Sequence, residues 1–360
     1  MAGPRQQRAV IRKPAESFED ALQHMEVADD DRGLETKTLG PQEVLLNVKA
    51  CCINYPDLLQ TTNGYQHKQT FPYTPGLEVS GEVVRVGEGV KVDELKPGSQ
   101  VMIMCGGQGL ATQLIVDAKQ CVAMPPNMSF AEAAAFRIGY ETAWHCLFER
   151  GNIHSDDVVL VTGATGGMGL AAVQVAKKVF GCTVIAAGGS DEKLAEVQRV
   201  GGADHIVNYN TDPQFSKTVK SLTGGNGVSL YFDTVGGEIF QQGLRSTAFA
   251  ARVLIVGFTS GERPKIPANY VLIKCLAVFG CRAGEVLQRL PDAANAIAGP
   301  RRTRLNQYAE RGWLKPHVSH KFPLTTEGVR GAYKALMDRQ VVGRVCVICD
   351  ETSSASSAKL

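Results

Sequence analysis

Apolar and polar residues follow two different periods along this chain, and the change of period divides it into regions. From about 8 to 130, short apolar runs alternate with turns rich in glycine and proline, which predicts many short β-strands. From 158 to about 281, apolar runs of strand length alternate with helical segments, which predicts an α/β region with a doubly wound parallel sheet. Two later predicted strands, at 317–322 and 343–348, return to the β-rich region.

The stretch 157–209 contains the strongest functional motif. An apolar strand at 158–161 is followed by a glycine-rich turn, a helix at about 170–179 and a second strand at 182–187. Glycines let the backbone of such a turn approach a pyrophosphate, which binds the exposed amides at the helix N-terminus. The turn therefore predicts a dinucleotide site. Its cofactor-binding residues are Gly166, Gly167, Met168 and Gly169.

The end of the second strand indicates which dinucleotide binds. An NAD site places an acidic residue about 20 residues past the glycine motif, where it holds the ribose 2′-hydroxyl. Gly189 and Ser190 stand there instead, and Asp191 and Glu192 belong to the start of the next helix. Ser190 and Lys193 can reach a 2′-phosphate, although Lys193 is also compatible with an ordinary solvated lysine. We therefore expect NADP(H).

Other predicted strands end at the same edge of the sheet. Candidates at this edge are Tyr209, Asp233-Thr234-Val235-Gly236 and Gly257-Phe258, all at the carboxyl ends of predicted parallel strands, where doubly wound sheets bind their ligands. We expect these residues to line the cofactor crevice, and the alternative is that some are ordinary loop residues. None of the seven histidines has a sequence neighbour that predicts a catalytic role.

Composition narrows the possible classes of function. The chain has 360 residues, of which 44% are hydrophobic and 21% charged, and its net charge is only +2. These values are typical of a globular protein, and no basic run predicts a nucleic-acid groove or a membrane surface. No apolar stretch approaches the length of a membrane span. The ten cysteines show no disulfide framework, and Cys346 and Cys349 are expected on opposite faces of one strand.

The C-terminal segment 351–360 has the composition of a flexible tail. It ends in Ala358-Lys359-Leu360, which is close to the Ser-Lys-Leu signal that directs proteins to peroxisomes. We expect the peroxisomal import receptor to bind it, which would place the protein in a peroxisome or a related organelle such as the glycosome. A three-residue match also arises by chance, so the alternative location is the cytoplasm.

A set of short motifs covers nearly the whole chain. They are Asn54-Tyr55-Pro56-Asp57, Gly64-Tyr65, Pro72–Glu78, Lys96-Pro97-Gly98, Gly166–Gly169, Gly188–Lys193, Val207-Asn208-Tyr209 and Pro267-Ala268-Asn269. Together they resemble the medium-chain dehydrogenase/reductase superfamily. Within it, the chain is most similar to zinc-free quinone oxidoreductases of the zeta-crystallin type, particularly the quinone oxidoreductase-like protein 2 branch.

This resemblance implies a domain organisation. It predicts a GroES-like β-rich substrate domain at 1–132, completed by 283–350, and a Rossmann NADP-binding domain at 133–282. The stretch Leu272 to Phe279 is predicted to end the Rossmann sheet, and a free edge there could pair with its counterpart to form a homodimer.

Departures from the zinc-dependent relatives predict that no metal is bound. Those relatives carry a cysteine ligand where Asn54 stands and a histidine ligand where Leu77 stands, and neither replacement is a good zinc ligand. Two further departures concern other residues. Ser99 replaces the usual acid after Pro-Gly, and Asn210 replaces an arginine that often contacts the 2′-phosphate.

The resemblance also implies a reaction and the residues that support it. NADPH would pass hydride to an electron-poor acceptor, with Tyr65 and Asn54 beside the nicotinamide. Tyr65 would donate a proton or hydrogen bond to the acceptor oxygen, unless it merely closes a packed loop, and Asp57 would orient the same loop. Thr142 and Arg344 match positions near the nicotinamide and the phosphates. The first expected acceptor is a quinone.

Two other functions stay open. One is reduction of α,β-unsaturated carbonyls, possibly enoyl-CoA thioesters, for which a basic surface would help. The candidates for that surface are Arg282, Arg289, Arg301, Arg302 and Arg304. The other is a non-catalytic, NADPH-binding protein that acts as a crystallin-like or RNA-binding partner, which the near-neutral net charge disfavours.

Overall fold

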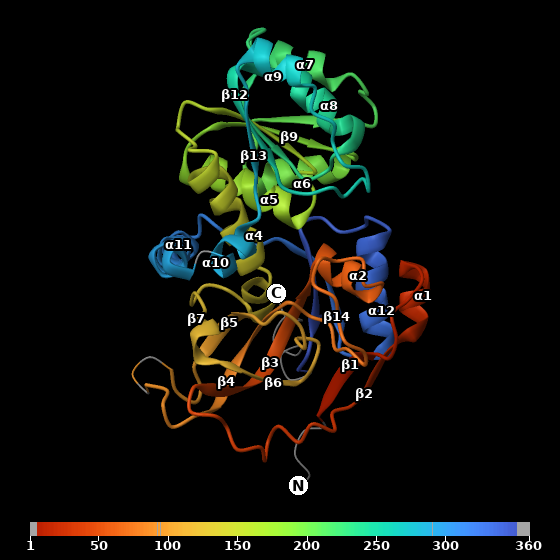
Figure 1. The fold of residues 1–360 in the computed structure, drawn as a ribbon, viewed down its shortest axis with the longest axis vertical. Coiled ribbons are helices and arrows are strands. Elements are labelled where there is room, and N and C mark those ends of the chain that lie inside the picture. The colour runs from red at the N-terminus through yellow and green to blue at the C-terminus, as the bar shows by residue number, and fades with distance from the viewer. Residues whose placement is uncertain (1–5, 92, 94, 290, 351–360) are drawn as a thin grey trace. The chain divides into compact units, whose positions relative to one another are not determined.

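The computed structural model describes residues 6–91, 93, 95–289 and 291–350, and they form two units (Figure 1). Unit 1 combines residues up to 138 with those from 318 onward, and unit 2 comprises 139–317. The expected targeting tripeptide, Ala358-Lys359-Leu360, lies outside the described residues.

Unit 1 is the β-rich unit. A seven-stranded sheet has the path β14-β15-β3-β4-β5-β7, with β6 paired to β3, and β1 and β2 form a separate pair. Its elements are β1 (Gln7–Ile11), α1 (Phe18–His24), β2 (Met25–Asp29), β3 (Glu43–Ile53), α2 (Tyr55–Thr61), β4 (Glu78–Val86), β5 (Gln100–Met104), β6 (Gln113–Asp117), η1 (Ala118–Gln120), β7 (Cys121–Ala123), α3 (Phe130–Ala134), β14 (Val318–Pro323), α12 (Thr326–Met337) and β15 (Arg344–Ile348).

Strand β3 is central because β4, β6 and β15 all pair with it. Apolar residues that alternate along it, including Val44, Leu46 and Val48, face the main core of the unit. Its antiparallel register with β15 pairs Ile53 with Val345 and Cys52 with Cys346. This register brings Asn54, which follows Ile53, and Arg344, which precedes Val345, to the same end of the two strands.

The two cysteines of the C-x-x-C sequence lie on opposite sides of the sheet, as expected. Cys346 packs in a small cluster with Cys52 and Ala131, whereas Cys349 belongs to the main core of unit 1. All ten cysteines are free thiols in the structure. The sequence prediction for this pair is confirmed.

Unit 2 contains a six-stranded parallel sheet with the order β10-β9-β8-β11-β12-β13. This confirms the predicted doubly wound sheet. The elements are α4 (Arg137–Trp144), which begins in unit 1, η2 (His145–Arg150), β8 (Val158–Thr162), α5 (Gly167–Gln174), η3 (Val175–Val179), β9 (Thr183–Gly188), α6 (Asp191–Gly201), β10 (His205–Asn208), α7 (Phe215–Leu222), β11 (Val228–Asp233), α8 (Gly237–Arg245), β12 (Thr247–Ile255), α9 (Ala268–Lys274), β13 (Ala277–Gly280), α10 (Ala283–Arg289) and α11 (Pro291–Glu310).

Helices cover both faces of this sheet. Helix α5 contacts α6, and α7 contacts α8, and Figure 1 shows the two pairs on opposite sides of the strands. Strands β8, β9 and β11 are mostly apolar and are buried over most of their length, as expected for strands covered by helices on both faces. The crossover helices therefore leave the carboxyl ends of the strands as the place where polar loops gather.

The boundary after the sheet differs from the expected one. The sequence analysis assigned 283–350 to the β-rich domain, but 283–317 belongs to unit 2 and the return starts at 318. The physical reason is a buried ion pair. Arg301 is only 2% exposed, and its guanidinium donates to both carboxylate oxygens of Glu149, at 2.9 and 2.7 Å. This bidentate pair attaches α11 to η2.

His145 completes this cluster. Its Nδ1 lies 2.7 Å from a Glu149 oxygen, a structural contact that the sequence analysis did not predict. Burial tends to raise the pKa of Glu149, but His145 and Arg301 outweigh that effect and lower it. Arg301 is therefore a core residue, and its expected place on a basic surface is wrong.

Strand β13 lies at one edge of the unit 2 sheet, as predicted. Leu272 and Ile273 on the preceding helix α9 are 79% and 71% exposed. The homodimer itself stays a prediction. No helix in the described part of the chain is long and apolar enough to cross a membrane.

We predict that Arg301→Ala destabilises unit 2 by about 3 kcal/mol, because it leaves the partly buried Glu149 carboxylate without its guanidinium. Because the pKa of Glu149 is lowered, its contribution to the free energy of unfolding is fully present above the ordinary pKa of a glutamate. It is lost as the pH falls through that lowered value. Urea unfolding at pH 7 and at lower pH measures both effects.

Arg304→Ala is the matched control, since the Arg304 guanidinium lies 5.9 Å from the centre of the Phe148 ring and this contact contributes less than about 1 kcal/mol. Equal destabilisation by the two substitutions would contradict the role given to the Arg301–Glu149 pair.

Candidate active site

The glycine turn joins β8 to α5. Gly166 precedes the helix as its N-cap, and Gly167, Met168 and Gly169 form its first turn. Gly163 adopts the left-handed region with φ +70°, and a Cβ on Gly169 would lie 2.3 Å from the Gly163 carbonyl oxygen. Only glycine lets the helix approach the preceding turn this closely. The turn thus presents free helix N-terminal amides and fits the pyrophosphate of a dinucleotide.

Asp233 connects two strand ends beside this turn. The Thr162 hydroxyl, at the end of β8, donates to the Asp233 carboxylate at 2.5 Å, and the Val235 and Gly236 amides donate at 3.2 and 2.9 Å. Burial raises the pKa of Asp233, while these donors favour its ionised form. The sequence analysis selected this stretch as part of the crevice, and Asp233 fixes the loop that contains Val235.

The segment after β12 lies along the same loop. The amides of Thr259 and Ser260 donate to the carbonyls of Thr234 and Val235, both at 3.0 Å. The expected crevice residues Gly257 and Phe258 immediately precede this contact, and Phe258 is 42% exposed. The structure therefore brings Val235, Gly257 and Phe258 together at the carboxyl ends of β11 and β12.

The end of β9 is held by Asn210. Its side-chain amide donates to the Gly189 carbonyl at 2.9 Å, and a Cβ on Gly189 would lie 2.8 Å from that amide nitrogen and 3.3 Å from the Tyr209 ring. Ser190 is the N-cap of α6, and its hydroxyl accepts from the Lys193 amide at 3.4 Å. The structure thus gathers Gly189, Ser190, Lys193 and Tyr209 around one turn.

In unit 1, three buried polar side chains form a chain of hydrogen bonds. The Arg344 guanidinium donates through Nη1 to the Asn54 carbonyl oxygen, and the Asn54 amide donates to Glu78 at 3.0 Å and to the Cys52 carbonyl at 3.4 Å. Glu78 also accepts from the Ile138 backbone amide at 2.9 Å. The sequence analysis named Asn54 and Arg344 but missed Glu78.

Burial raises the pKa of Glu78, which is 1% exposed, and the nearby Arg344 guanidinium opposes this effect. The two charged groups do not touch, since Arg344 Nη1 and the nearer Glu78 oxygen are 4.0 Å apart. Asn54 lies between them as a neutral bridge. The three side chains together carry a compensated pair of charges inside the unit.

Asp57 supports the same region from α2. Its carboxylate is fully buried and accepts from the amides of Asn54 at 2.8 Å and Gly76 at 3.0 Å. Burial raises its pKa to about 7, against the backbone amides that favour the ionised form. Asp57 therefore joins the start of α2 to the turn before β4, and this buried position suits the predicted role of orienting a loop.

Two predicted residues remain to be located, Tyr65 and Thr142. Tyr65 is half-buried in the loop after α2, where its ring centre is 6.0 Å from that of His67. Thr142 lies on α4 in unit 2, whereas Arg344 belongs to unit 1. Thr142 and Arg344, which the resemblance places near the nicotinamide and the phosphates, are therefore described separately, one in each unit.

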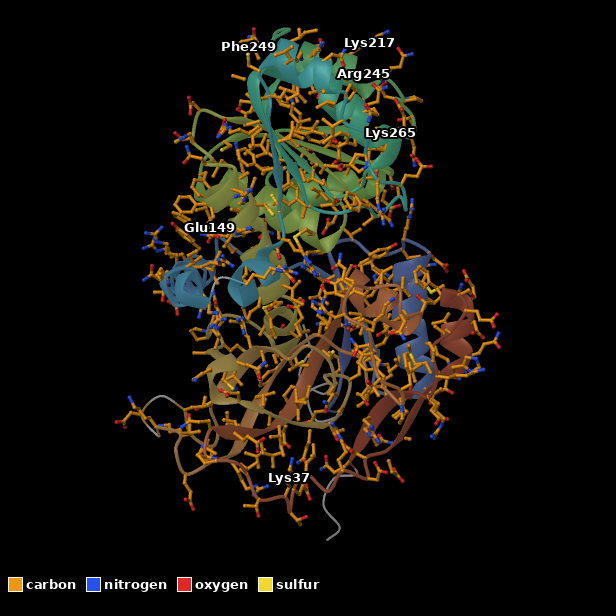
Figure 2. The ribbon with its side chains drawn as sticks, viewed as in Figure 1. Lys37, Glu149, Lys217, Arg245, Phe249 and Lys265 are labelled. Atoms are coloured by element: carbon orange, nitrogen blue, oxygen red, sulfur yellow. The ribbon has the colours of Figure 1, made fainter. Side chains whose placement is uncertain are left out.

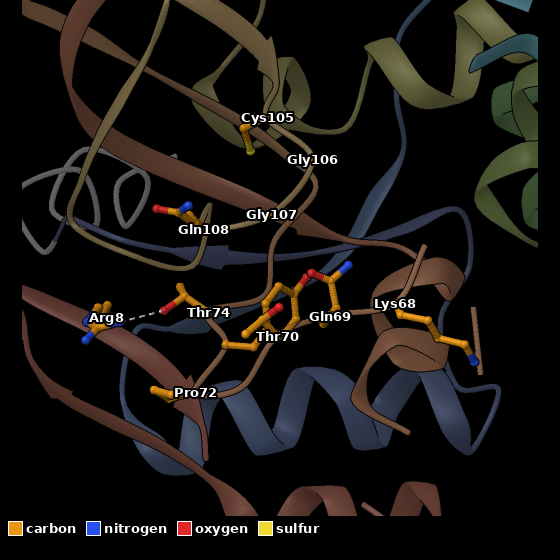
Figure 3. Close-up of a pocket in the computed structure, with 11 residues that line it drawn as sticks. Arg8, Lys68, Gln69, Thr70, Pro72, Thr74, Cys105, Gly106, Gly107 and Gln108 are labelled. Atoms are coloured by element: carbon orange, nitrogen blue, oxygen red, sulfur yellow. Dashed lines mark hydrogen bonds between the residues drawn. The ribbon is translucent and has the colours of Figure 1, made fainter. Parts of the chain in front are cut away.

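A pocket of about 440 Å³ lies in unit 1 between Arg8, segment 68–74 and segment 105–108. Figure 3 shows Arg8 beside Thr74, to whose hydroxyl it donates at 3.3 Å, and Lys68 at the other end. Both cations have partners, since Arg8 pairs with Asp31 at 3.0 Å and Lys68 donates to a backbone carbonyl. The pocket is polar, and the sequence analysis predicted none of its lining residues as a site residue, although Pro72, Tyr73 and Thr74 belong to the Pro72–Glu78 motif.

The donor set at Asn54 and Leu77 does not suit zinc, because the Asn54 oxygen is bonded to Arg344 and leucine has no donor atom. Across the described ranges, no group of three or more histidine, cysteine, aspartate or glutamate side chains could hold a metal ion.

Comparison with known proteins agrees with this architecture. Residues 40–126 match the GroES-like domain of alcohol dehydrogenases, and residues 167–299 match the family described as zinc-binding dehydrogenase. The quinone oxidoreductase-like protein 2 homolog of Nematostella vectensis is 36% identical over 314 residues, which cover 87% of this chain and 83% of the relative.

Two solved structures extend the comparison. A probable oxidoreductase from Mycobacterium abscessus has a TM-score of 0.82 at 29% identity, covering 96% of this chain and 100% of that one. The JamJ enoyl reductase in its apo form has a TM-score of 0.78 at 25% identity, covering 96% and 99%. The chain therefore belongs to the medium-chain dehydrogenase/reductase superfamily, as an oxidoreductase of the quinone oxidoreductase type.

We predict that Gly169→Ala destabilises the protein by about 1–3 kcal/mol, because the new Cβ meets the Gly163 carbonyl at 2.3 Å. Gly166→Ala is the matched control, since its nearest neighbour would lie at 3.5 Å and its cost stays under about 1 kcal/mol. Thermal unfolding without ligand measures both variants. Equal stability of the two would show that the tight approach of helix and turn is not required.

Proposed function

We propose that this protein is an NADPH-dependent, zinc-independent reductase that transfers hydride to a quinone. The observation that carries the proposal is that Asn54, which stands where zinc-dependent relatives place a cysteine ligand, is held between Arg344 and Glu78 by hydrogen bonds. Without a metal to polarise an alcohol or ketone, the favoured acceptor is one that is already electron-poor. The similarity to a protein named quinone oxidoreductase-like supports the same class of acceptor.

The cofactor part of the proposal rests on unit 2. The α5 amides would bind the pyrophosphate, and Ser190 and Lys193 would bind the 2′-phosphate at a strand end that carries no carboxylate at 188–190. The bound nicotinamide would supply hydride. The segments around Val235 and Gly257 would support it, since Asp233 and the backbone bonds to Thr234 fix their loops.

The chain's own residues would orient the acceptor and handle its proton. Tyr65, in the loop after α2, would donate a hydrogen bond or proton to the acceptor oxygen as charge develops there. Asp57 would hold that loop indirectly, because its carboxylate fixes the first turn of α2 against Gly76. These are orienting and proton-handling roles, and the hydride chemistry belongs to the cofactor.

A second candidate is a reductase of α,β-unsaturated carbonyl compounds, including enoyl thioesters. The observation that favours it is the similarity, over 96% of this chain, to a solved enoyl reductase. The basic surface expected for a CoA group loses Arg301, which is buried against Glu149. The quinone proposal is therefore preferred.

Steady-state NADPH consumption tests the two candidates. Purified protein would be offered 9,10-phenanthrenequinone and crotonyl-CoA in separate reactions, with NADH as the cofactor control. We expect turnover of the quinone with NADPH. Preference for crotonyl-CoA would favour the second candidate, and NADPH binding without turnover of either acceptor would count against both.

We predict that Lys193→Ala weakens NADPH binding by about tenfold and leaves NADH binding nearly unchanged, because it removes a charged donor to the 2′-phosphate. Lys217→Ala on α7 is the control, since Lys217 is exposed (Figure 2). Cofactor fluorescence titration measures each dissociation constant. A parallel loss of NADH affinity would mean that Lys193 does not read the 2′-phosphate.

A further inference from the structure

Two pairs of cysteines have thiols in contact with each other. In unit 2, the Cys146 thiol donates a hydrogen bond to the Cys281 sulfur. In unit 1, Cys52 contacts Cys346, which lies directly opposite it on the neighbouring strand. All four thiols are free in the structure. Oxidation can join two thiols in contact, but the rate depends on the thiolate fraction and on access, and the two pairs differ in both.

Strand β12 positions both members of the unit 2 pair. The Cys281 amide, just after β13, donates to the Ile255 carbonyl at the end of β12, at 3.0 Å. The Arg252 guanidinium, also on β12, donates to the Gly151 carbonyl at 2.7 Å and so attaches the end of η2, which contains Cys146. Because both segments are attached to one strand, the contact between the two thiols is part of the fold of unit 2.

The surroundings of Cys281 favour its thiolate. The hydrogen bond from the Cys146 thiol lowers the pKa of Cys281, while burial opposes this effect. The Arg150 guanidinium lowers the pKa further, and it lies 5.3 Å from the centre of the Phe279 ring, two residues before Cys281. Phe279 thus holds a cation near the sulfur. The thiolate is the form of cysteine that attacks oxidants.

Cys146 has the opposite properties. It is 0% exposed, and burial together with its contact to Cys281 raises its pKa well above that of a free thiol. Glu149 raises this pKa further, and Arg301 opposes the increase. Cys281 is 8% exposed, so a small oxidant meets Cys281 before Cys146. The pair therefore combines an attacking thiolate with a protonated thiol beside it, which is the arrangement that resolves a sulfenic acid into a disulfide.

The unit 1 pair lacks these features. Cys52 and Cys346 are both 0% exposed and pack with Ala131 in an apolar cluster. The contact with Cys346 and burial raise the pKa of Cys52 well above that of a free thiol. Thiols buried in this way are inert toward oxidants. Cys52 and Cys346 are therefore an internal control for Cys146 and Cys281.

We propose that Cys146 and Cys281 form a modification site at which hydrogen peroxide converts the two thiols into a disulfide. The Cys281 thiolate attacks one peroxide oxygen, so an S–O bond forms and the O–O bond breaks. The leaving hydroxide takes the proton that Cys281 gave up and becomes water. The Cys146 sulfur then attacks the Cys281 sulfenic acid, the S–S bond forms, the S–O bond breaks, and the Cys146 proton leaves with the hydroxide as water.

In this sequence the two sulfurs lose two electrons, which the peroxide gains. The disulfide would connect η2 to the segment after β13. The inference goes beyond the proposed function and does not depend on it, since neither NADPH nor an acceptor takes part.

Peptide mapping by mass spectrometry tests the site in the wild-type protein. Folded protein would be treated with hydrogen peroxide at pH 7, its remaining thiols alkylated, and the chain digested without reduction. We expect a linked pair of peptides that contains Cys146 and Cys281, and we expect dithiothreitol to separate them. These two thiols should be lost at least about tenfold faster than Cys52 and Cys346. Cys275 is exposed and reports that the oxidant is active.

Two results of this mapping would overturn the inference. One is that Cys146 and Cys281 stay reduced while Cys275 is oxidised. The other is that Cys52 and Cys346 become linked as fast as the unit 2 pair, which would mean that contact alone decides the reaction. The mapping uses no variant, so it decides the question even if the cysteine variants fail to fold.

Serine variants test the two roles. In Cys146→Ser the reaction should stop at a sulfenic acid on Cys281, which dimedone captures as a stable adduct. In Cys281→Ser we expect Cys146 to stay reduced at the same peroxide concentration. Dimedone labelling of Cys146 in Cys281→Ser, with none on Cys281 in Cys146→Ser, would contradict the assignment of Cys281 as the attacking thiol.

Arg150→Gln tests the contribution of the cation. We expect it to slow the loss of the Cys281 thiol by about threefold, because the thiolate fraction falls. Arg304→Gln is the matched control, since this guanidinium lies 5.9 Å from the centre of a different ring, that of Phe148. Equal rates in the two variants would show that Arg150 does not activate Cys281.

Discussion

The structure of unit 1 depends on one physical constraint, which is the burial of a carboxylate and a guanidinium that do not touch. Burying an unpaired charge is costly, so Glu78 and Arg344 persist in the core only because Asn54 bridges them and the Ile138 amide binds the carboxylate. Asn54 stands where the resemblance gives zinc-dependent relatives a cysteine ligand. The charges of Glu78 and Arg344 compensate each other, and the Arg344 Nη2 group has no hydrogen-bond partner among the described residues.

Unit 2 has a different requirement. Its backbone groups have to bind a flexible cofactor that carries several charges. The parallel sheet aligns the carboxyl ends of its strands, and short-range bonds then shape each loop there. Asp233 fixes the loop after β11, and Asn210 fixes the turn after β9. The glycine turn brings the α5 amides to the same edge. Each loop is thus positioned before any ligand arrives, which lowers the entropy lost on binding.

The fold and the cofactor motif were predictable because they depend on local patterns. The apolar runs predicted the parallel strands, and the spacing of the glycines predicted the turn before α5. Helix α2 was missed, although Asn54, Pro56 and Asp57 form a helix-start pattern that could have revealed it. The Arg344–Asn54 bond joins residues 290 positions apart and depends on the register of β15 against β3, which no local pattern encodes. For the same reason the burial of Arg301 against Glu149 was not foreseen.

The central claim is that the protein reduces a quinone with NADPH and without a metal, which one experiment tests directly. Protein dialysed against a strong chelator would be assayed for quinone-dependent NADPH oxidation, and its zinc content would be measured on the same sample. The account predicts full activity with less than about one zinc per ten chains, because Asn54 and Leu77 provide no suitable zinc ligands. Activity that disappears on dialysis and returns in proportion to added zinc would contradict it.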